Sequence, residues 1–256
     1  MSEHILVERR EAVQLIRLNR PEKKNAITRA MYAAMAAALR QGDADEAVRC
    51  HLILGVPGAF SAGNDLADFL AVATGARDGA EEVFDFLVAL AGCRKPLVSA
   101  ADGIAVGIGA TMHLHCDLTF ATPQTVFRTP FVDLGLVPEA GSSLLGPRVL
   151  GPQRAFALLA MGEGLEAQAA CQAGLIHRVV AAEALEPTAL ATARTLAAKP
   201  AEALRITREL LRGPREEVLA RIREEGGLFR ERLKSQEARA AFTAFMNRKR
   251  SDAAQG

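Results

Sequence analysis

The 256-residue sequence contains no tryptophan, one tyrosine, four cysteines and almost no net charge. The four cysteines, Cys50, Cys93, Cys116 and Cys171, lie far apart in apolar segments, and none forms a C-x-x-C pair. This spacing argues against a disulfide framework or a metal site, and it predicts reduced, buried thiols.

Charge and hydropathy exclude further classes. The chain carries 31 basic and 30 acidic residues, so neither a nucleic-acid-binding surface nor an acidic tail is indicated. No apolar run approaches the ~20 residues needed to span a bilayer. The N-terminal MSEHILVERR interrupts its apolar run with charges, unlike a signal peptide, and the C-terminal AAQG carries no targeting tripeptide. We therefore expect a soluble, cytoplasmic protein that binds neither nucleic acid nor membrane.

Strand-like and helix-like segments alternate in the first 150 residues. Residues 12–19 alternate in polarity and residues 51–56 are continuously apolar, which are two patterns typical of strands. Residues 28–42 predict a helix that Thr28 caps and that ends before Gly42. Helical spacing then dominates in 151–162, 183–198, 201–212, 215–234 and 237–249. This order favours an α/β fold with a helical C-terminal appendage.

Two glycine-containing segments each allow two interpretations. GIAVGIGATM (103–112) resembles a dinucleotide fingerprint, but Met112 stands where a small residue is needed and no suitable acidic residue follows, so a nicotinamide site is disfavoured. Its glycines either let a strand turn into a packed helix or leave amides free for a ligand oxygen. FSAGNDL (60–66), within the predicted loop 57–66, is either an ordinary turn or a place where a ligand approaches the backbone.

Glu139 stands out in TPFVDLGLVPEAGSS (129–143), where a carboxylate lies among small and apolar residues. It either caps a turn or helix, or it transfers protons with a pKa raised toward neutrality by its apolar surroundings. His113 and His115 are two residues apart, so on a helix they project in different directions, and we expect burial with satisfied nitrogens rather than a metal pair.

Several segments, in the same order and at the same spacing, resemble one family. They are NRPEKKNAIT (19–28), FSAGNDLADF (60–69), KPLVSAADGIAVGIGATM (95–112), CDLTFAT (116–122), RTPFVDLGLVPEAGSS (128–143) and AQAACQAGLIHRVV (167–180). Together they are similar to the enoyl-CoA hydratase/isomerase (crotonase) superfamily. Within it they look most like the peroxisomal-type Δ3,Δ2-enoyl-CoA isomerases.

The resemblance implies an architecture and a set of partners. The fold would be α/β, a crotonase-type superhelix of repeated ββα turns followed by a C-terminal α-helical trimerisation region. Residues 1–195 would form the acyl-CoA-binding core and residues 196–256 the helical oligomerisation region. The substrate would be an acyl-CoA, no cofactor would be needed because coenzyme A is part of the substrate, and the chain would assemble as a homotrimer or as a hexamer formed by two trimers.

The resemblance also assigns a catalytic site. The backbone N–H groups of Asn64 and Ile108 would hold the thioester oxygen. Thr111 and Phe131 occupy the two positions where hydratases of the family carry catalytic glutamates, and neither side chain can act as a carboxylate base. Glu139, in the Pro-Glu pair, matches the single glutamate of the isomerases and would carry the proton.

Further positions are implied to bind the substrate or its coenzyme A. They are Lys23, Lys24, Ala62, Asp65, Leu66, Phe131, Phe245 and Arg248. The plainer alternatives are a solvated basic surface for the lysines, helix packing for Phe245, and a loop-bracing role for Asp65.

The function expected first is therefore a Δ3,Δ2-enoyl-CoA isomerase of fatty acid β-oxidation. An enoyl-CoA hydratase that relies on Glu139 alone and a non-catalytic acyl-CoA-binding scaffold remain as alternatives.

Overall fold

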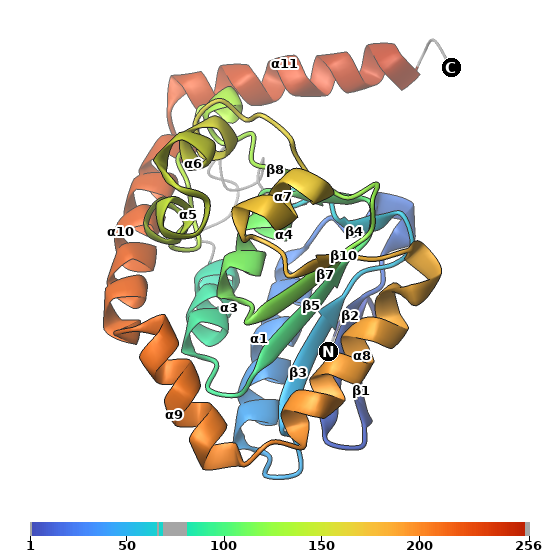
Figure 1. The fold of residues 1–256 in the computed structure, drawn as a ribbon. Helices are drawn as coiled ribbons and strands as arrows, with labels where there is room; N and C mark the ends of the chain where they lie inside the picture. The colour runs from blue at the N-terminus through green and yellow to red at the C-terminus, as the bar shows by residue number, and fades with distance from the viewer. Residues whose placement is uncertain (1, 66, 69–80, 254–256) are drawn as a thin grey trace.

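The computed structural model describes residues 2–65, 67–68 and 81–253 (Figure 1). The strands are β1 (Ile5–Arg10), β2 (Val13–Leu18), β3 (Cys50–Leu54), β4 (Ala59–Ser61), β5 (Leu97–Ala101), β6 (Ile104–Val106), β7 (Leu118–Ala121), β8 (Val126–Arg128), β9 (Leu165–Glu166) and β10 (Arg178–Val179). The helices are η1 (Pro21–Lys23), α1 (Arg29–Ala44), α3 (Glu81–Gly92), α4 (Ile108–Thr111), η2 (Met112–His115), η3 (Val132–Leu134), α5 (Ser142–Leu150), α6 (Pro152–Leu159), α7 (Ala167–Ala173), α8 (Ala182–Ala197), α9 (Ala201–Arg212), α10 (Arg215–Leu233) and α11 (Gln236–Ala253).

From β3 to β8, successive strands alternate between two sheets. The larger sheet has the order β1-β2-β3-β5-β7-β10 and the smaller one β4-β6-β8-β9. Each ββα unit in this part of the chain thus adds one strand to the larger sheet, one strand to the smaller sheet and then a helix, as in β3-β4-α3 and β5-β6-α4. Pairing is parallel except between β1 and β2 and between β8 and β9. The predicted α/β superhelix of ββα turns with C-terminal helices is confirmed.

The larger sheet is covered on both faces, which explains its apolar strands. Leu15, Leu52, Val98 and Phe120 point toward α8 in one core cluster, whereas their neighbours Ile16 and Ile53 belong to the cluster beneath α1 and α3. Strand residues alternate between faces, so a strand buried on both sides must be apolar throughout. The prediction for residues 51–56 is confirmed, with β3 buried along its whole length.

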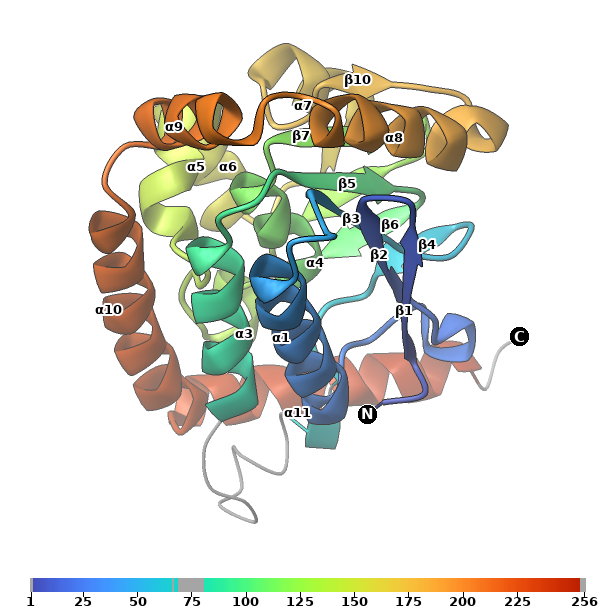
Figure 2. The same ribbon diagram turned by 90° about the horizontal axis from the view of Figure 1, so that it is seen from below.

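The C-terminal helices wrap this core. Figure 2 shows α10 beside α3, on the side away from α1, and α11 crossing the molecule. Gly135 lies against α11, because a Cβ there would come within 2.8 Å of the Ala238 nitrogen. The predicted boundary at 195/196 falls inside α8, which packs on the sheet, and the division into two regions stays a prediction.

Several elements differ from the predictions. Helix α1 continues through Gly42 to Ala44, so this glycine does not end the helix. A Cβ at position 42 would come within 1.9 Å of the Gln14 amide oxygen and 2.5 Å of the His51 ring, so glycine is needed there to avoid a clash. The predicted loop 57–66 contains the short strand β4. The predicted buried helix 108–116 is divided into α4 and η2. The expected exposed connection 71–82 lies outside the described residues except for Glu81 and Glu82, which begin α3.

The cysteines are free, as expected, but burial holds for only two of them. Cys50 and Cys93 are buried, and Cys116 and Cys171 are half-buried. Among the helices in the described part of the chain, none combines the length and apolar character needed to cross a membrane.

Candidate active site

The two glycine turns predicted to supply amides lie against each other. Strands β4 and β6 pair in parallel, so the turns that follow them emerge at the same edge. Gly63, with φ of +85°, lies so near this second turn that a Cβ would approach the Val106 carbonyl oxygen to 2.8 Å. Gly107, with φ of +56°, then leads directly into α4, which Ile108 begins. Both glycines are required, one by close approach and both by their left-handed backbone.

The backbone pattern leaves both predicted amides available. Ile27 N–H donates to Gly63 and its carbonyl accepts from Asp65, so the intervening Asn64 N–H points to the opposite side of this parallel bridge. Ile108 is the first residue of α4, where a backbone N–H has no partner within the helix. Within the described residues, neither N–H donates to a backbone acceptor. Their convergence on one substrate oxygen remains a prediction.

Glu139 lies at the wall of a cavity. The cavity, about 840 Å³ including its open mouth, is mostly apolar, and its described lining is Ile27, Arg29, Tyr32, Asn64, Asp65, Asp68, Val83, Phe84, Leu87, Glu139, Ala140, Ile222, Gly226, Phe229, Arg230 and Leu233. Glu139 is only 6% exposed. Burial raises its pKa to about 8, the nearby Glu225 adds to the rise, and a hydrogen bond from Thr111 opposes it.

Thr111 touches Glu139 directly. Its hydroxyl donates to Oε1 at 2.6 Å, whereas the buried Oε2 has no hydrogen-bond partner among the described residues. Thr111 occupies the position where the resemblance expects a glutamate in a hydratase. Its hydroxyl therefore contacts the carboxylate of Glu139. A buried carboxylate with one free oxygen and a pKa near neutrality can accept and return a proton.

The loop around Glu139 is held from two sides. On one side, Nε2 of His115 lies 2.6 Å from the carbonyl oxygen of Ala140. On the other side, the buried Glu225 of α10 accepts from Gly141 N–H at 2.6 Å and from Ser143 N–H at 2.9 Å. The Glu225 carboxylate thereby caps the N-terminus of α5, where helix amides and the helix dipole stabilise negative charge.

The two histidines are buried, as predicted, but not fully satisfied. Nδ1 of His113 lies 2.9 Å from the Ser99 hydroxyl oxygen, whereas its Nε2 has no partner in the described chain, which corrects the expectation for this ring. Burial lowers the pKa of His113 to about 3 and that of His115 to about 4, so both rings are neutral near pH 7.

Asn64 and Asp65 are fixed by side-chain contacts. The Tyr32 hydroxyl donates to the Asn64 amide oxygen at 2.6 Å. Asp65 lies 2.6 Å from Arg20 and also accepts from Ala67 N–H. Burial acts to raise the pKa of Asp65, but these hydrogen bonds outweigh it and the pKa is lowered. Asp65 therefore stays ionised and braces its loop.

The other predicted binding positions fall into three groups. Lys23 and Lys24 are exposed, and the Lys24 carbonyl accepts from Ala62 N–H at 2.8 Å, so this basic corner adjoins the first glycine turn. Phe131 is buried, and neither it nor Ile108 is among the described residues that line the cavity. The remaining three, Leu66 and the side chains of Phe245 and Arg248, lie outside the described part of the chain.

The sequence interpretation missed one wall of the cavity. Ile222, Gly226, Phe229 and Leu233 line it from α10, with the i, i+4, i+7 and i+11 spacing of a single helix face. That spacing predicts a buried face but does not say what it packs against. The signal that could have directed attention there is Glu225, a carboxylate next to this apolar stripe.

Comparison with known proteins now identifies the family. The sequence model for the family described as enoyl-CoA hydratase/isomerase matches residues 8–255. The chain belongs to the enoyl-CoA hydratase/isomerase family. It is an enzyme of that family, which is the crotonase superfamily expected from the sequence.

Individual relatives include enzymes named as isomerases. The chain is 38% identical over 216 residues to 1,2-epoxyphenylacetyl-CoA isomerase of Escherichia coli (strain K12), covering 82% of each chain. It is 34% identical over 253 residues to enoyl-CoA delta isomerase 2 of Rattus norvegicus, covering 97% of this chain but only 64% of the rat protein. The solved structure of Pseudomonas aeruginosa OdaA superimposes with a TM-score of 0.90 at 42% identity, covering 96% of this chain and 99% of OdaA.

Proposed function

We propose that this enzyme is a Δ3,Δ2-enoyl-CoA isomerase that acts in fatty acid β-oxidation. The observation that carries the proposal is the contact of Thr111 with Glu139, because it leaves one buried carboxylate of raised pKa where a hydratase of the family would have two. Asp65 and Asp68 also border the cavity. Asp65 pairs with Arg20, and Asp68 accepts from the Arg29 backbone N–H, so each has a structural role.

In the proposed reaction Glu139 removes a proton from C2 of the 3-enoyl thioester. The electron pair moves onto the thioester oxygen, where the Asn64 and Ile108 amides stabilise the enolate more than the neutral ground state. The protonated Glu139 then returns the proton at C4, and the double bond moves from C3–C4 to C2–C3. No water and no further cofactor take part. The apolar walls that raise the pKa of Glu139 also keep water from the enolate.

The same proposal covers substrate and assembly. The apolar surface contributed by α3 and α10 suits an acyl chain, and the exposed Lys23 and Lys24 beside the Ala62 turn suit the phosphates of coenzyme A, with Leu66, Phe131, Phe245 and Arg248 as further contacts. Helix α9 exposes Ile206, Leu210 and Leu211, the last two with more than three quarters of their surface. Such apolar exposure supports burial between subunits. The proposed assembly is a homotrimer or a dimer of trimers, and the proposed location is the cytoplasm.

One substrate pair tests the reaction. Wild type, Glu139→Gln and Asp133→Asn are assayed with 3-hexenoyl-CoA and crotonyl-CoA. Asp133 is an exposed acid six residues before Glu139 and is the matched control. We expect the wild type and Asp133→Asn to isomerise equally, Glu139→Gln to lose about a hundredfold or more, and hydration of crotonyl-CoA to be slow.

The alternatives give different results in the same assay. Rapid hydration of crotonyl-CoA by the wild type, lost in Glu139→Gln, would replace the proposal by a hydratase that uses Glu139 alone. Tight binding of both thioesters without turnover would replace it by an acyl-CoA-binding scaffold.

A further inference from the structure

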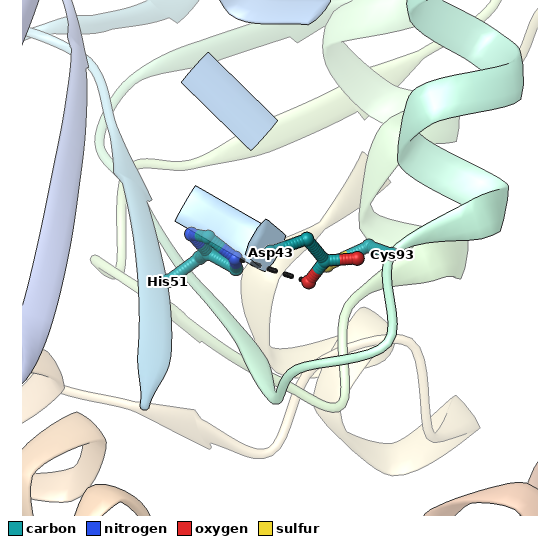
Figure 3. A group of neighbouring side chains, drawn as sticks. All are labelled: Asp43, His51 and Cys93. Carbon is teal, nitrogen blue, oxygen red and sulfur yellow. Dashed lines mark hydrogen bonds and ion pairs between the residues drawn. The ribbon is translucent and has the colours of Figure 1, made fainter. Parts of the chain in front are cut away.

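A second cluster of reactive side chains lies outside the cavity. Asp43 at the end of α1, His51 in β3 and Cys93 just after α3 point toward one another (Figure 3). One ligand atom from each lies within 4.8 Å of the other two. His51 is fully buried and Cys93 is 2% exposed, so the cluster is not a chance grouping of surface groups.

Two of the three separations agree with those around a tetrahedral metal ion, and the third, between His51 and Cys93, is at most 4.8 Å. Zinc bonds of about 2.0–2.3 Å to oxygen, nitrogen and sulfur place neighbouring ligand atoms roughly 3.3–3.6 Å apart. Here the Asp43 Oδ1 atom lies 3.5 Å from His51 Nε2 and 3.7 Å from Cys93 Sγ. The Cys93 thiol donates to Asp43 Oδ1 across the second of these separations, and both separations lie within a few tenths of an ångström of the metal geometry.

The buried histidine lacks any other partner. Neither ring nitrogen of His51 makes a hydrogen bond within the described residues. A buried imidazole with both nitrogens unpaired is unfavourable, and its Nε2 is aimed at the Asp43 carboxylate. A cation between them would satisfy this nitrogen. The small residue Gly42 preserves the space, since a Cβ there would come within 2.5 Å of the His51 ring.

The carboxylate is oriented by a second layer of hydrogen bonds. Asp43 Oδ2 accepts from Arg94 N–H at 2.8 Å, and Oδ1 accepts from Lys95 N–H at 3.1 Å. The Lys95 ammonium is held by two carbonyl oxygens, those of Gly42 and Asp45, each at 2.6 Å. Outer contacts of this kind fix ligands in metal sites. The Lys95 carbonyl oxygen accepts from the Cys93 thiol at 3.4 Å and would become available as a fourth ligand once that thiol loses its proton.

We propose that Asp43, His51 and Cys93 form a structural Zn²⁺ site that ties the end of α1 to β3 and to the α3–β5 connection. The mixed oxygen, nitrogen and thiolate set suits zinc better than magnesium or calcium. Binding replaces the thiol proton of Cys93 by the metal and releases that proton to solvent. The sequence argued against a metal site because the four cysteines lie far apart and form no C-x-x-C pair. Only the fold brings Asp43, His51 and Cys93 together.

The test uses the full chain, stripped with a chelator and then titrated with Zn²⁺ or with Co²⁺ as a spectroscopic probe. We expect about one metal per chain and a thiolate-to-cobalt charge-transfer band. At a hundredfold excess over the dissociation constant, the melting temperature should rise by about 5–10 °C. Cys93→Ala and Asp43→Asn should lose the band or weaken zinc binding at least about 100-fold.

Cys50→Ala is the matched control, because Cys50 is also buried and adjoins His51 in the chain but belongs to the core cluster on the opposite face of the sheet. The Cys50→Ala variant should still bind about one metal per chain and show the thiolate-to-cobalt charge-transfer band. Asp43→Asn retains an acceptor oxygen for only one of the two backbone amides, so circular dichroism of this variant is used to separate metal binding from folding. Metal content below a tenth per chain after titration, or an equal cobalt band in Cys93→Ala, would overturn the proposal.

Discussion

Two buried carboxylates lie close to the same loop and differ in how they are held. Glu139 is on the loop, makes one hydrogen bond with Thr111 and leaves one oxygen unpaired. Glu225 is on α10 and accepts three hydrogen bonds, from the N–H of Gly141 and from the N–H and hydroxyl of Ser143. Burial raises the pKa of both, and for Glu225 these hydrogen bonds oppose the rise. The difference separates the group proposed to exchange protons, Glu139, from a group that holds structure, Glu225.

The comparison also explains the backbone of the loop. Ala140 has φ of +62° and Gly141 of +70°, which is unfavourable for the alanine. His115 fixes the Ala140 carbonyl and Glu225 fixes the next amide, so hydrogen bonds on both sides maintain this strained turn. This strained backbone directly follows Glu139, which lines the cavity.

The largest effect should follow from breaking the structural carboxylate. Glu225→Ala leaves the amides of Gly141 and Ser143 buried without acceptors, so the free energy of unfolding should fall by about 2–4 kcal/mol. Isomerisation should fall at least about tenfold because the loop loses its anchor. Thermal or denaturant unfolding and steady-state kinetics measure both effects.

The neighbouring exposed residue gives the control for this change. Glu224→Ala, on the same turn of α10, should alter stability by no more than about 0.5 kcal/mol. Equal stability losses in the two variants would remove the distinction between the carboxylates.

The next effect concerns the pH dependence of stability. Burial raises the pKa of Glu139 from 4.5 to about 8, so the folded state holds a proton that the unfolded state releases. The contribution of this proton binding to the free energy of unfolding is fully present below pH 4.5 and is lost as pH rises through 8. Glu139→Gln removes this loss. Its melting temperature should exceed that of the wild type by several degrees at pH 9, and the gain should disappear near pH 4.5. A gain that is constant across this range would contradict the raised pKa.

The fold was largely predictable because its signals are local. Continuous apolar runs indicated β3, and capping by Thr28 marked the start of α1, where the hydroxyl accepts from Met31 N–H. The missed elements lack such signals. Strand β1 carries charged residues because it forms the exposed edge of the sheet, and β4 has only three residues. Gly42 was misinterpreted as a helix end, because glycine is required there by close packing against Gln14 and His51, which are distant or non-adjacent in the sequence.

The site was predictable only where family motifs mark it. Glu139 was singled out through the Pro-Glu pair and lines the cavity, and its catalytic role stays a prediction. Glu225 and Tyr32 were missed, because their partners Ser143 and Asn64 lie 82 and 32 residues away. Contacts over such distances leave no trace in local spacing, and the same applies to the cluster of Asp43, His51 and Cys93.

A smaller effect should follow from changing the single hydrogen bond of Glu139. The Thr111 hydroxyl lowers the pKa of Glu139, so Thr111→Val should raise it further, and the pH of half-maximal isomerisation should move upward by roughly one unit. Activity at pH 7 should fall by up to about tenfold, since less of the carboxylate is ionised. Thr111→Ser retains the hydroxyl and should keep the wild-type profile. Coincident profiles for the two variants would show that this hydrogen bond does not tune the base.

The smallest effect should come from Tyr32, whose hydroxyl fixes the side chain of Asn64. Tyr32→Phe keeps the ring contact with Phe86, at 5.5 Å between centroids, and removes only the hydrogen bond. Loss of about 1 kcal/mol should lower kcat about fivefold. KM should change little, because in the proposed reaction the Asn64 backbone N–H acts mainly on the charged enolate. Phe86→Leu should disturb stability while leaving kcat closer to the wild type. If Tyr32→Phe instead raised KM at constant kcat, the hydroxyl would serve substrate binding in the ground state rather than the orientation of the Asn64 turn.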